Sequence, residues 1–203
     1  MKNKNFRVLL TGGGTGGHIY PALAIADGIK GKYPQTKFLY IGTKRGLEAD
    51  VVSKKGIPFR TITAEGLTRK ISWPALRAGL KSLKGFGEAW RLIKNFRPQV
   101  VVGTGGYVCG PVVLAAALQG IPTLIHEQNA YPGITNKLLA RFADKICITF
   151  PESAKYFKAK GELSPAYIAA ASCINAPNET RGGIMSTFRT KTRIFSSQRA
   201  LSE

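Results

Sequence analysis

Short apolar runs, typical of buried strands, alternate with helical patterns over most of this chain. After each run, apolar residues recur with the period of an α-helix. Strands and helices that alternate in this way predict a parallel sheet with helices on both faces. We therefore expect an α/β fold built on a doubly wound parallel sheet. The predicted strands are 8–10, 38–41, 59–62, 99–102, 123–125 and 145–149.

The same pattern predicts the helices that connect these strands. In the first helix, Pro21 occupies a plausible first-turn position, where its missing N–H costs least. The longest helix begins after Ser72 as N-cap and runs to about Asn95. Its leucines and a tryptophan recur at helical spacing and predict a stripe that faces the core: Leu76, Leu80, Leu83 and Trp90. The remaining helices are expected at 47–55, 111–118 and 134–141.

The pattern changes near residue 158. Residues 158–203 have no sustained apolar period and contain scattered Ser, Thr, Arg and Pro, and only 166–174 could form a local helix. We therefore expect one domain at 1–157 and a poorly ordered tail at 158–203.

A glycine-rich loop follows the first strand and is the most informative stretch of the chain. Five of the six residues 12–17 are glycine, and a helix follows at once. Glycines let the backbone approach an anion closely, and the N–H groups at a helix start point at it. His18 lies where this loop becomes the helix, so it can act on whatever the loop holds.

Two further polar segments follow strands of the same predicted sheet. A second glycine-rich loop, 103–107, follows the fourth strand, and His-Glu-Gln-Asn at 126–129 follows the fifth. In such sheets, ligands bind outside the carboxyl ends of the strands. We therefore expect both glycine loops and the 126–129 segment to meet at one rim of the sheet.

The first glycine loop alone leaves its ligand open. Gly12, Gly14 and Gly17 fit the dinucleotide fingerprint, which needs an acidic residue at the end of the second strand. That strand ends in 42–45 without a carboxylate, although Arg45 could serve an NADP-binding oxidoreductase instead. A P-loop is excluded, because no Gly-Lys-Ser/Thr closes the loop.

The charge balance indicates an anionic partner. The chain has 30 Lys and Arg against 11 Asp and Glu, a net charge of +19. It carries no helix-turn-helix, zinc-finger or RNP signature, so a phosphorylated substrate or an anionic membrane surface is favoured over nucleic acid. Three widely spaced cysteines disfavour a disulfide framework or a metal site, and no apolar run is long enough to span a bilayer. The N-terminus does not read as a signal peptide, so we expect a cytoplasmic protein.

Three segments together resemble the MurG family, the UDP-N-acetylglucosamine transferases of bacterial peptidoglycan synthesis. They are 11–21, 103–111 and 126–129, and the resemblance covers about 5–157 with matching spacing. The resemblance implies the Rossmann-like N-terminal half of a GT-B glycosyltransferase. It also implies inverting transfer of N-acetylglucosamine from UDP to the C4 hydroxyl of lipid I, without a metal or cofactor, at the cytoplasmic face of the inner membrane.

The resemblance also assigns roles to single residues. His18 is the candidate general base, because a helix N-terminus disfavours the imidazolium, and Glu127 is a second catalytic candidate. The alternative for His18 is a helix-capping role, and for His126 and Glu127 a structural hydrogen-bonding role. The positions matching donor contacts are Thr15, Gly16, Gly17 and Asn129. The acceptor and its diphosphate are assigned Gly13, Gly14, Gly105, Gly106, Tyr107, His126 and Gln128.

The long helix suggests contact with a membrane. Basic residues near an anionic leaflet each favour binding, and exposed Ile71 and Trp73 could enter the interface. The basic face comprises Arg77, Lys81 and Lys84. The alternative is a solvated basic face on an ordinary packed helix.

The chain departs from the family after Phe157, where a second domain with most of the uridine and sugar contacts is expected. A frameshift or truncation would explain the change. Two functions therefore stay open: the transferase itself, or an inactive remnant that binds lipid I or the membrane surface.

Overall fold

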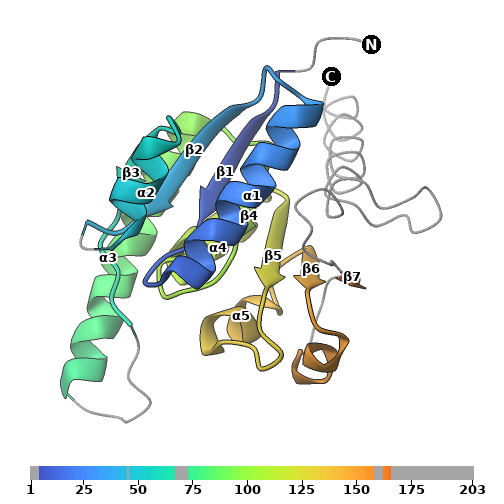
Figure 1. The fold of residues 1–203 in the computed structure, drawn as a ribbon. Helices are drawn as coiled ribbons and strands as arrows, with labels where there is room; N and C mark the ends of the chain where they lie inside the picture. The colour runs from blue at the N-terminus through green and yellow to red at the C-terminus, as the bar shows by residue number, and fades with distance from the viewer. Residues whose placement is uncertain (1–4, 45, 67–72, 158–161, 166–203) are drawn as a thin grey trace, which may run out of the picture.

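The computed structural model describes residues 5–44, 46–66, 73–157 and 162–165, which form a parallel seven-stranded sheet. Its strand order is β3-β2-β1-β4-β5-β6-β7 (Figure 1). The chain thus moves outward from β1 to one edge and then returns past it through β4, which confirms the doubly wound sheet. The strands are β1 Arg7–Thr11, β2 Lys37–Gly42, β3 Phe59–Thr61, β4 Val100–Gly103, β5 Thr123–Glu127, β6 Lys145–Ile148 and β7 Glu162–Pro165.

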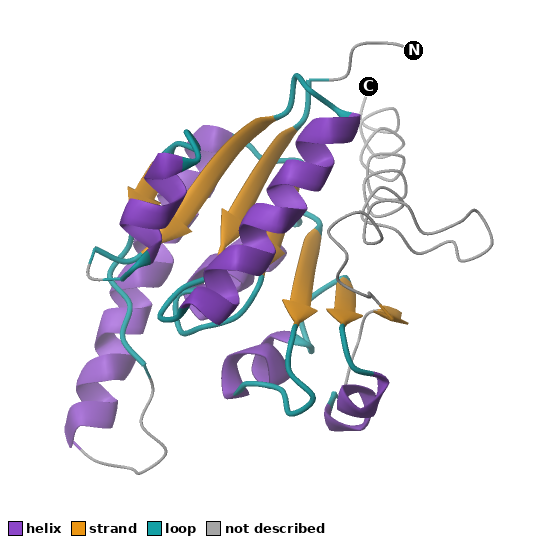
Figure 2. Ribbon diagram, viewed as in Figure 1, coloured by secondary structure: helices purple, strands orange, loops and turns teal. Residues whose placement is uncertain are grey.

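Helices cover both faces of the sheet (Figure 2). One face packs against α1 and α2, and the opposite face against α3, α4 and α5. The helices are α1 Gly16–Lys32, α2 Glu48–Lys54, α3 Trp73–Phe96, α4 Cys109–Leu118 and α5 Ile134–Leu139, followed by the 3-10 helix η1 Pro151–Tyr156.

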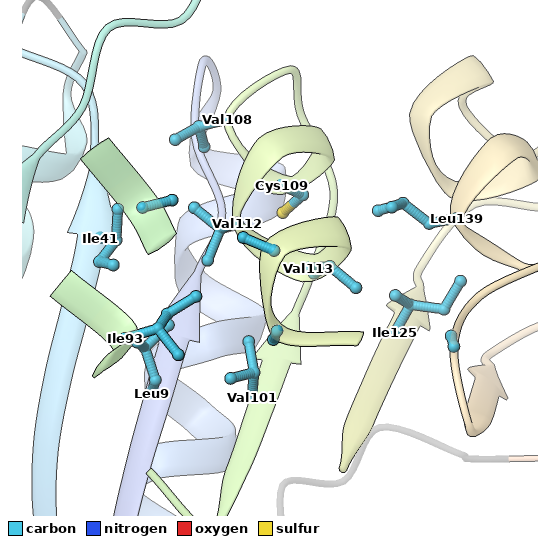
Figure 3. Close-up of a cluster of buried hydrophobic side chains, with 14 of the residues drawn as sticks. Leu9, Ile41, Ile93, Val101, Val108, Cys109, Val112, Val113, Ile125 and Leu139 are labelled. Atoms are coloured by element: carbon cyan, nitrogen blue, oxygen red, sulfur yellow. The ribbon is translucent and has the colours of Figure 1, made fainter. Parts of the chain in front are cut away.

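Alternation along each strand divides the core between these two faces. In β1, Leu9 packs toward α3 and α4, whereas Val8 and Leu10 pack toward α1. Figure 3 shows the first cluster, in which Ile93 of α3 and Val112 of α4 lie over the strands. Because both faces are covered, the central strands β1 and β4 contain continuous apolar runs, Val8–Leu10 and Val100–Val102, rather than alternating in polarity.

Two predicted boundaries at the rim are wrong. The helix α1 begins at Gly16, so Pro21 lies inside it rather than in its first turn. Thr15 has an extended backbone, and its carbonyl accepts from both His18 N–H and Ile19 N–H, which closes the first turn before the proline. The strand β5 extends to Glu127, so His126 and Glu127 belong to the strand instead of following it.

A seventh strand lies beyond the predicted domain boundary. Glu162–Pro165 pairs in parallel with β6, at the edge of the sheet. A strand this short carries no readable apolar period, and a terminal proline is tolerated at a sheet edge. The predicted tail therefore includes residues that extend the sheet, and the local helix proposed at 166–174 lies outside the described residues.

The predicted core stripe of α3 is wrong at Leu83. This side chain is 69% exposed, whereas Gly85, Ala89 and Ile93 are buried and Trp90 packs against the core. The beginning of α3 projects past the sheet in Figure 1, so a residue there has no strand to pack against.

Candidate functional site

The two glycine-rich loops meet at the carboxyl ends of β1 and β4, which are neighbours in the sheet. Gly13 N–H donates to the Gly105 carbonyl at 3.3 Å, and Thr104 N–H donates to the Thr11 carbonyl at 2.9 Å. This is the point where the strand order reverses, the usual position of ligands in such sheets. The prediction that both loops open on one rim is confirmed.

Glycine is required where the loops touch. Gly105 and Gly106 have φ angles of +108° and +83°. A Cβ on Gly106 would collide with the Gly13 backbone, and one on Gly105 would lie 2.7 Å from His18 Nδ1. The second loop therefore lets the His18 ring lie directly against its backbone.

His18 is anchored through one ring nitrogen. Its Nδ1 lies 3.0 Å from the Thr104 carbonyl oxygen, which can only accept, so Nδ1 carries the proton. The basic lone pair of the neutral ring is then on Nε2. Thr104 also fixes the start of α1, because its hydroxyl donates to the His18 carbonyl at 2.6 Å.

Gln128 brings the third segment to the same point. Its Nε2 lies 2.5 Å from His18 Nδ1, while its buried Oε1 has no hydrogen-bond partner among the described residues. With Nδ1 protonated, the amide fits better when turned so that Oε1 faces the ring. The loop after β5 thereby contacts the histidine that sequence reasoning placed at the centre of the site.

Glu127 is occupied by hydrogen bonds from its own loop. Oε1 accepts from Asn129 N–H at 3.0 Å and Asn129 Nδ2 at 2.9 Å. Oε2 accepts from Gly133 N–H at 3.1 Å and Asn136 Nδ2 at 2.9 Å. The carboxylate is buried, so this geometry favours the structural alternative for Glu127.

His126 is not accessible to an acceptor, contrary to the prediction that it contacts the acceptor or its diphosphate. Its side chain is fully buried, and Nε2 lies 3.2 Å from the Thr149 hydroxyl. Burial lowers the pKa of His126 to about 4, against a smaller opposing effect of Glu127. The physical reason is its place within β5, where the pleat turns the ring into the molecule.

Several predicted N–H donors are already engaged. Gly13 N–H is used by Gly105, and Gly105 N–H is directed at Cys109 Sγ at 3.2 Å. Burial raises the pKa of the Cys109 thiol to about 12, so it stays a neutral partner of these loops. Gly14 and Gly106 remain the candidates for contacting a diphosphate through their backbone.

The start of α1 is open toward solvent. Thr15 makes no side-chain capping bond, and no acidic residue lies in the first turn. Thr15 and Gly17 are exposed and Gly16 is half-buried, so the predicted donor contacts are accessible. Asn129 is exposed as well, although Glu127 holds its Nδ2.

Sequence reasoning missed a carboxylate at the end of β2. Glu48 of α2 is fully buried, and its Oε1 accepts from Thr43 N–H at 2.9 Å and from the Thr43 hydroxyl at 2.7 Å. The Thr43 hydroxyl also lies 3.5 Å from the Tyr107 hydroxyl, which links β2 to the second glycine loop. An acid in the first turn of a helix was the available signal.

The predicted membrane residues are only partly described. Ile71 and the side chains of Trp73 and Arg77 lie outside the described part of the structure. Lys81 pairs with Glu65 at 2.6 Å, and Lys84 is exposed next to Leu83. None of the described helices is long and apolar enough to cross a membrane. The described residues also contain no cluster of three His, Cys, Asp or Glu able to hold a metal ion.

Residues 8–148 match the family model of the glycosyltransferase family 28 N-terminal domain. Two relatives are each named UDP-N-acetylglucosamine–N-acetylmuramyl-(pentapeptide) pyrophosphoryl-undecaprenol N-acetylglucosamine transferase. The chain is 59% identical over 157 residues to that of Moorella thermoacetica, covering 77% of the chain and 42% of the relative. It is 56% identical over 158 residues to that of Desulforamulus reducens, covering 78% of the chain and 42% of the relative.

A solved structure gives the same assignment. The chain is similar to Acinetobacter baumannii MurG with a TM-score of 0.66 and 36% sequence identity, covering 79% of this chain and 45% of that one. The chain thus spans about two-fifths of the length of the relatives it matches.

Proposed function

Because this chain belongs to glycosyltransferase family 28 through its N-terminal domain, we propose that it forms the acceptor side of a UDP-N-acetylglucosamine transferase. The donor is UDP-N-acetylglucosamine, and the acceptor is the C4 hydroxyl of lipid I, an undecaprenyl-diphosphate-linked muramoyl peptide. The names of the relatives support this choice of substrates. The family match also favours a transferase over the alternative function, an NADP-binding oxidoreductase.

The proposal rests on the hydrogen bond between His18 Nδ1 and the Thr104 carbonyl. Nδ1 donates to the Thr104 carbonyl, so Nε2 is available as a base at the open start of α1. In the transfer, Nε2 takes the proton of the acceptor hydroxyl, whose oxygen forms a bond to the anomeric carbon of the donor. The bond from that carbon to the diphosphate breaks, and UDP leaves with the electron pair from the opposite face, which inverts the configuration.

The glycine loops supply backbone donors for diphosphate charge. Gly14 and Gly106 lie at the meeting point of the loops, and Gly16 and Gly17 begin α1, where the helix dipole favours an anion. Tyr107 lies beside Gly14, since a Cβ there would be 3.2 Å from its ring. We assign Glu127 the role of positioning residue, because its four hydrogen bonds order the loop that carries Gln128 and Asn129.

A chimera tests the transfer proposal. Residues 1–157 are joined to the part of the Moorella relative that follows its match, and transfer from UDP-N-acetylglucosamine to lipid I is measured. We expect product from the chimera and none from the Moorella part alone. A folded chimera that binds UDP-N-acetylglucosamine without making product would contradict the proposal.

Acceptor binding without transfer is the second candidate function for this chain. Calorimetry with UDP-N-acetylglucosamine and with a soluble lipid I analogue separates the two functions. A binding domain is expected to take up the analogue with little heat from the donor. Strong donor binding by this chain would instead favour transfer.

We also propose that the chain binds the cytoplasmic face of the bacterial cell membrane as a peripheral protein. Exposed Leu83 beside exposed Lys84 supports contact with an anionic leaflet. Lys84→Ala is expected to weaken binding to anionic vesicles about fivefold, since each cation contributes about 1 kcal/mol. Lys94→Ala, at an exposed position farther along α3, is the control. Binding that ignores anionic lipid content and salt would contradict this proposal.

A further inference from the structure

A pocket lies at the opposite end of the sheet from the glycine loops. It occupies about 640 Å³, within the range of small-molecule sites. The residues that begin β2 line it, together with the end of α1, the loop before β3 and the end of α3. Since β2 runs from Lys37 to Gly42, its two ends are separated by about 16 Å. This pocket is therefore distinct from the proposed transfer site.

The pocket exists because β3 is short. The strand pairs with β2 only from Tyr40 onward, where Tyr40 N–H donates to the Pro58 carbonyl at 2.8 Å. Pro58 has no N–H to offer to the Phe38 carbonyl, so β3 does not continue along the start of β2. The space that a longer β3 would fill lies between the helices of the two faces.

The floor of the pocket is apolar and includes an aromatic ring from each face. Phe38 belongs to the core under α1, and Phe96 packs against the core under α3. Leu39, Ile57 and Leu92 complete this floor. An aromatic or apolar ligand body would find matching surface here.

The rim of the pocket is basic. Lys30, Lys37 and Arg60 are exposed, and none of them has an ion-pair partner among the described residues. The single acid of the lining, Asp27, is paired with Lys55 at 2.8 Å. The remaining charge is therefore positive and available to an anion.

Inside the pocket, a buried hydroxyl lacks a partner. Thr36 is 7% exposed, and its Oγ1 makes no hydrogen bond within the described part of the chain. A buried polar atom without a partner is uncommon and costs stability unless something binds it. A ligand oxygen in the pocket would accept a hydrogen bond from this hydroxyl.

We propose that this pocket binds a nucleoside phosphate or a similar phosphorylated aromatic compound. The phosphates lie among Lys30, Lys37 and Arg60, the aromatic body lies on Phe38 and Phe96, and Thr36 donates to an oxygen of the ligand. The inference goes beyond the proposed transfer, because it concerns the opposite end of the sheet.

Amide NMR and calorimetry with the full chain test the proposal, with ATP, tripolyphosphate and adenosine as probes in magnesium-free buffer. ATP is expected to shift the amides of Thr36, Lys37 and Phe38 and to bind more tightly than either other probe. Shifts at Gly12–Gly17 report the proposed transfer site instead, so the two proposals can fail separately. The proposal for the pocket would be overturned if ATP shifted only the amides of the glycine loops. It would also be overturned if tripolyphosphate bound as tightly as ATP.

A matched pair of lysines on α1 isolates the contribution of the rim. Lys30 lines the pocket, whereas exposed Lys32 in the same last turn does not. Lys30→Ala is expected to weaken the binding of ATP about fivefold, whereas Lys32→Ala is expected to weaken it less than about twofold. Thr36→Val removes the buried hydroxyl donor and is expected to weaken the binding of ATP about tenfold. Equal effects of the two lysine variants would show nonspecific attraction by surface charge and overturn the proposal.

Discussion

The two histidines of this chain lie at the same rim of the sheet in opposite surroundings. His18 lies in the first turn of α1, is half-buried and binds the Thr104 carbonyl through Nδ1. His126 lies within β5, is fully buried and contacts the Thr149 hydroxyl through Nε2. Both were predicted to be site residues, but only His18 has a partly exposed side chain.

The comparison shows what separates a reactive group from a structural one in this fold. A residue after the strand end projects into the rim, whereas one inside the strand is turned into a covered face. Glu127 follows the same rule, because its carboxylate is buried and fully hydrogen-bonded. We therefore assign the proposed transfer chemistry to the loops and the first turn of α1.

The largest expected effect is on turnover. His18→Ala in the chimera with the Moorella C-terminal part is expected to lower the transfer rate at least about hundredfold, because a general base contributes that much or more. The unfolding midpoint is the control for folding. Near-normal turnover in a folded variant would remove His18 as the base.

His126 is expected to affect stability through pH. Its folded pKa of about 4 lies below the ordinary value of 6.5, so the unfolded chain binds its proton first. The contribution of neutral His126 to the free energy of unfolding is complete above pH 6.5. The free energy of unfolding falls by about 3 kcal/mol as the pH drops toward 4.

Urea unfolding at neutral and acid pH measures this dependence. His126→Asn has no titrating ring and is expected to lose less stability on acidification than the unmodified chain. An equally steep loss in both proteins would contradict the buried, neutral state of His126.

Glu127→Gln is expected to lower the free energy of unfolding by about 2 kcal/mol, because the amide would place a donor against donors such as Gly133 N–H. Glu152→Gln changes an exposed carboxylate on η1 and is the matched control, expected within about 0.5 kcal/mol. Urea unfolding compares the two, and similar small losses would show that the Glu127 network contributes little.

A pair of glycines tests the close contact between the two loops. Gly106→Ala strains a positive φ and collides with Gly13, so we expect a loss of about 1 to 3 kcal/mol in thermal unfolding. The backbone at Gly133 has a φ of −63°, and a Cβ there would meet no other atom within 4 Å. We therefore expect Gly133→Ala to be neutral or slightly stabilising. Equal behaviour of the two variants would argue against close contact between the loops.

The central part of the sheet could be predicted because its strands contain apolar runs between helical patterns, as at Val100–Gly103. The exposure of Leu83 could not, because periodicity gives the face of a helix but not how far it extends past the sheet. The edge strand Glu162–Pro165 had no apolar signal, since backbone pairing with β6 forms it.

In the site, the shared rim of the glycine loops could be predicted because each loop follows the carboxyl end of a parallel strand. Their direct contact depends on β1 and β4 being neighbours, which the structure shows. The burial of His126 depends on one residue of strand length, a boundary that composition does not specify. The role of Glu48 depends on α2 folding back toward Thr43, a tertiary contact with only a weak local signal.

The proposed role of His18 is tested most directly by the tautomer of its neutral ring, read from long-range proton–nitrogen NMR of the imidazole at alkaline pH. We expect a proton on Nδ1, directed at the Thr104 carbonyl, and none on Nε2. A proton found on Nε2 would contradict this role, because the nitrogen left basic would then face the Thr104 carbonyl rather than a substrate.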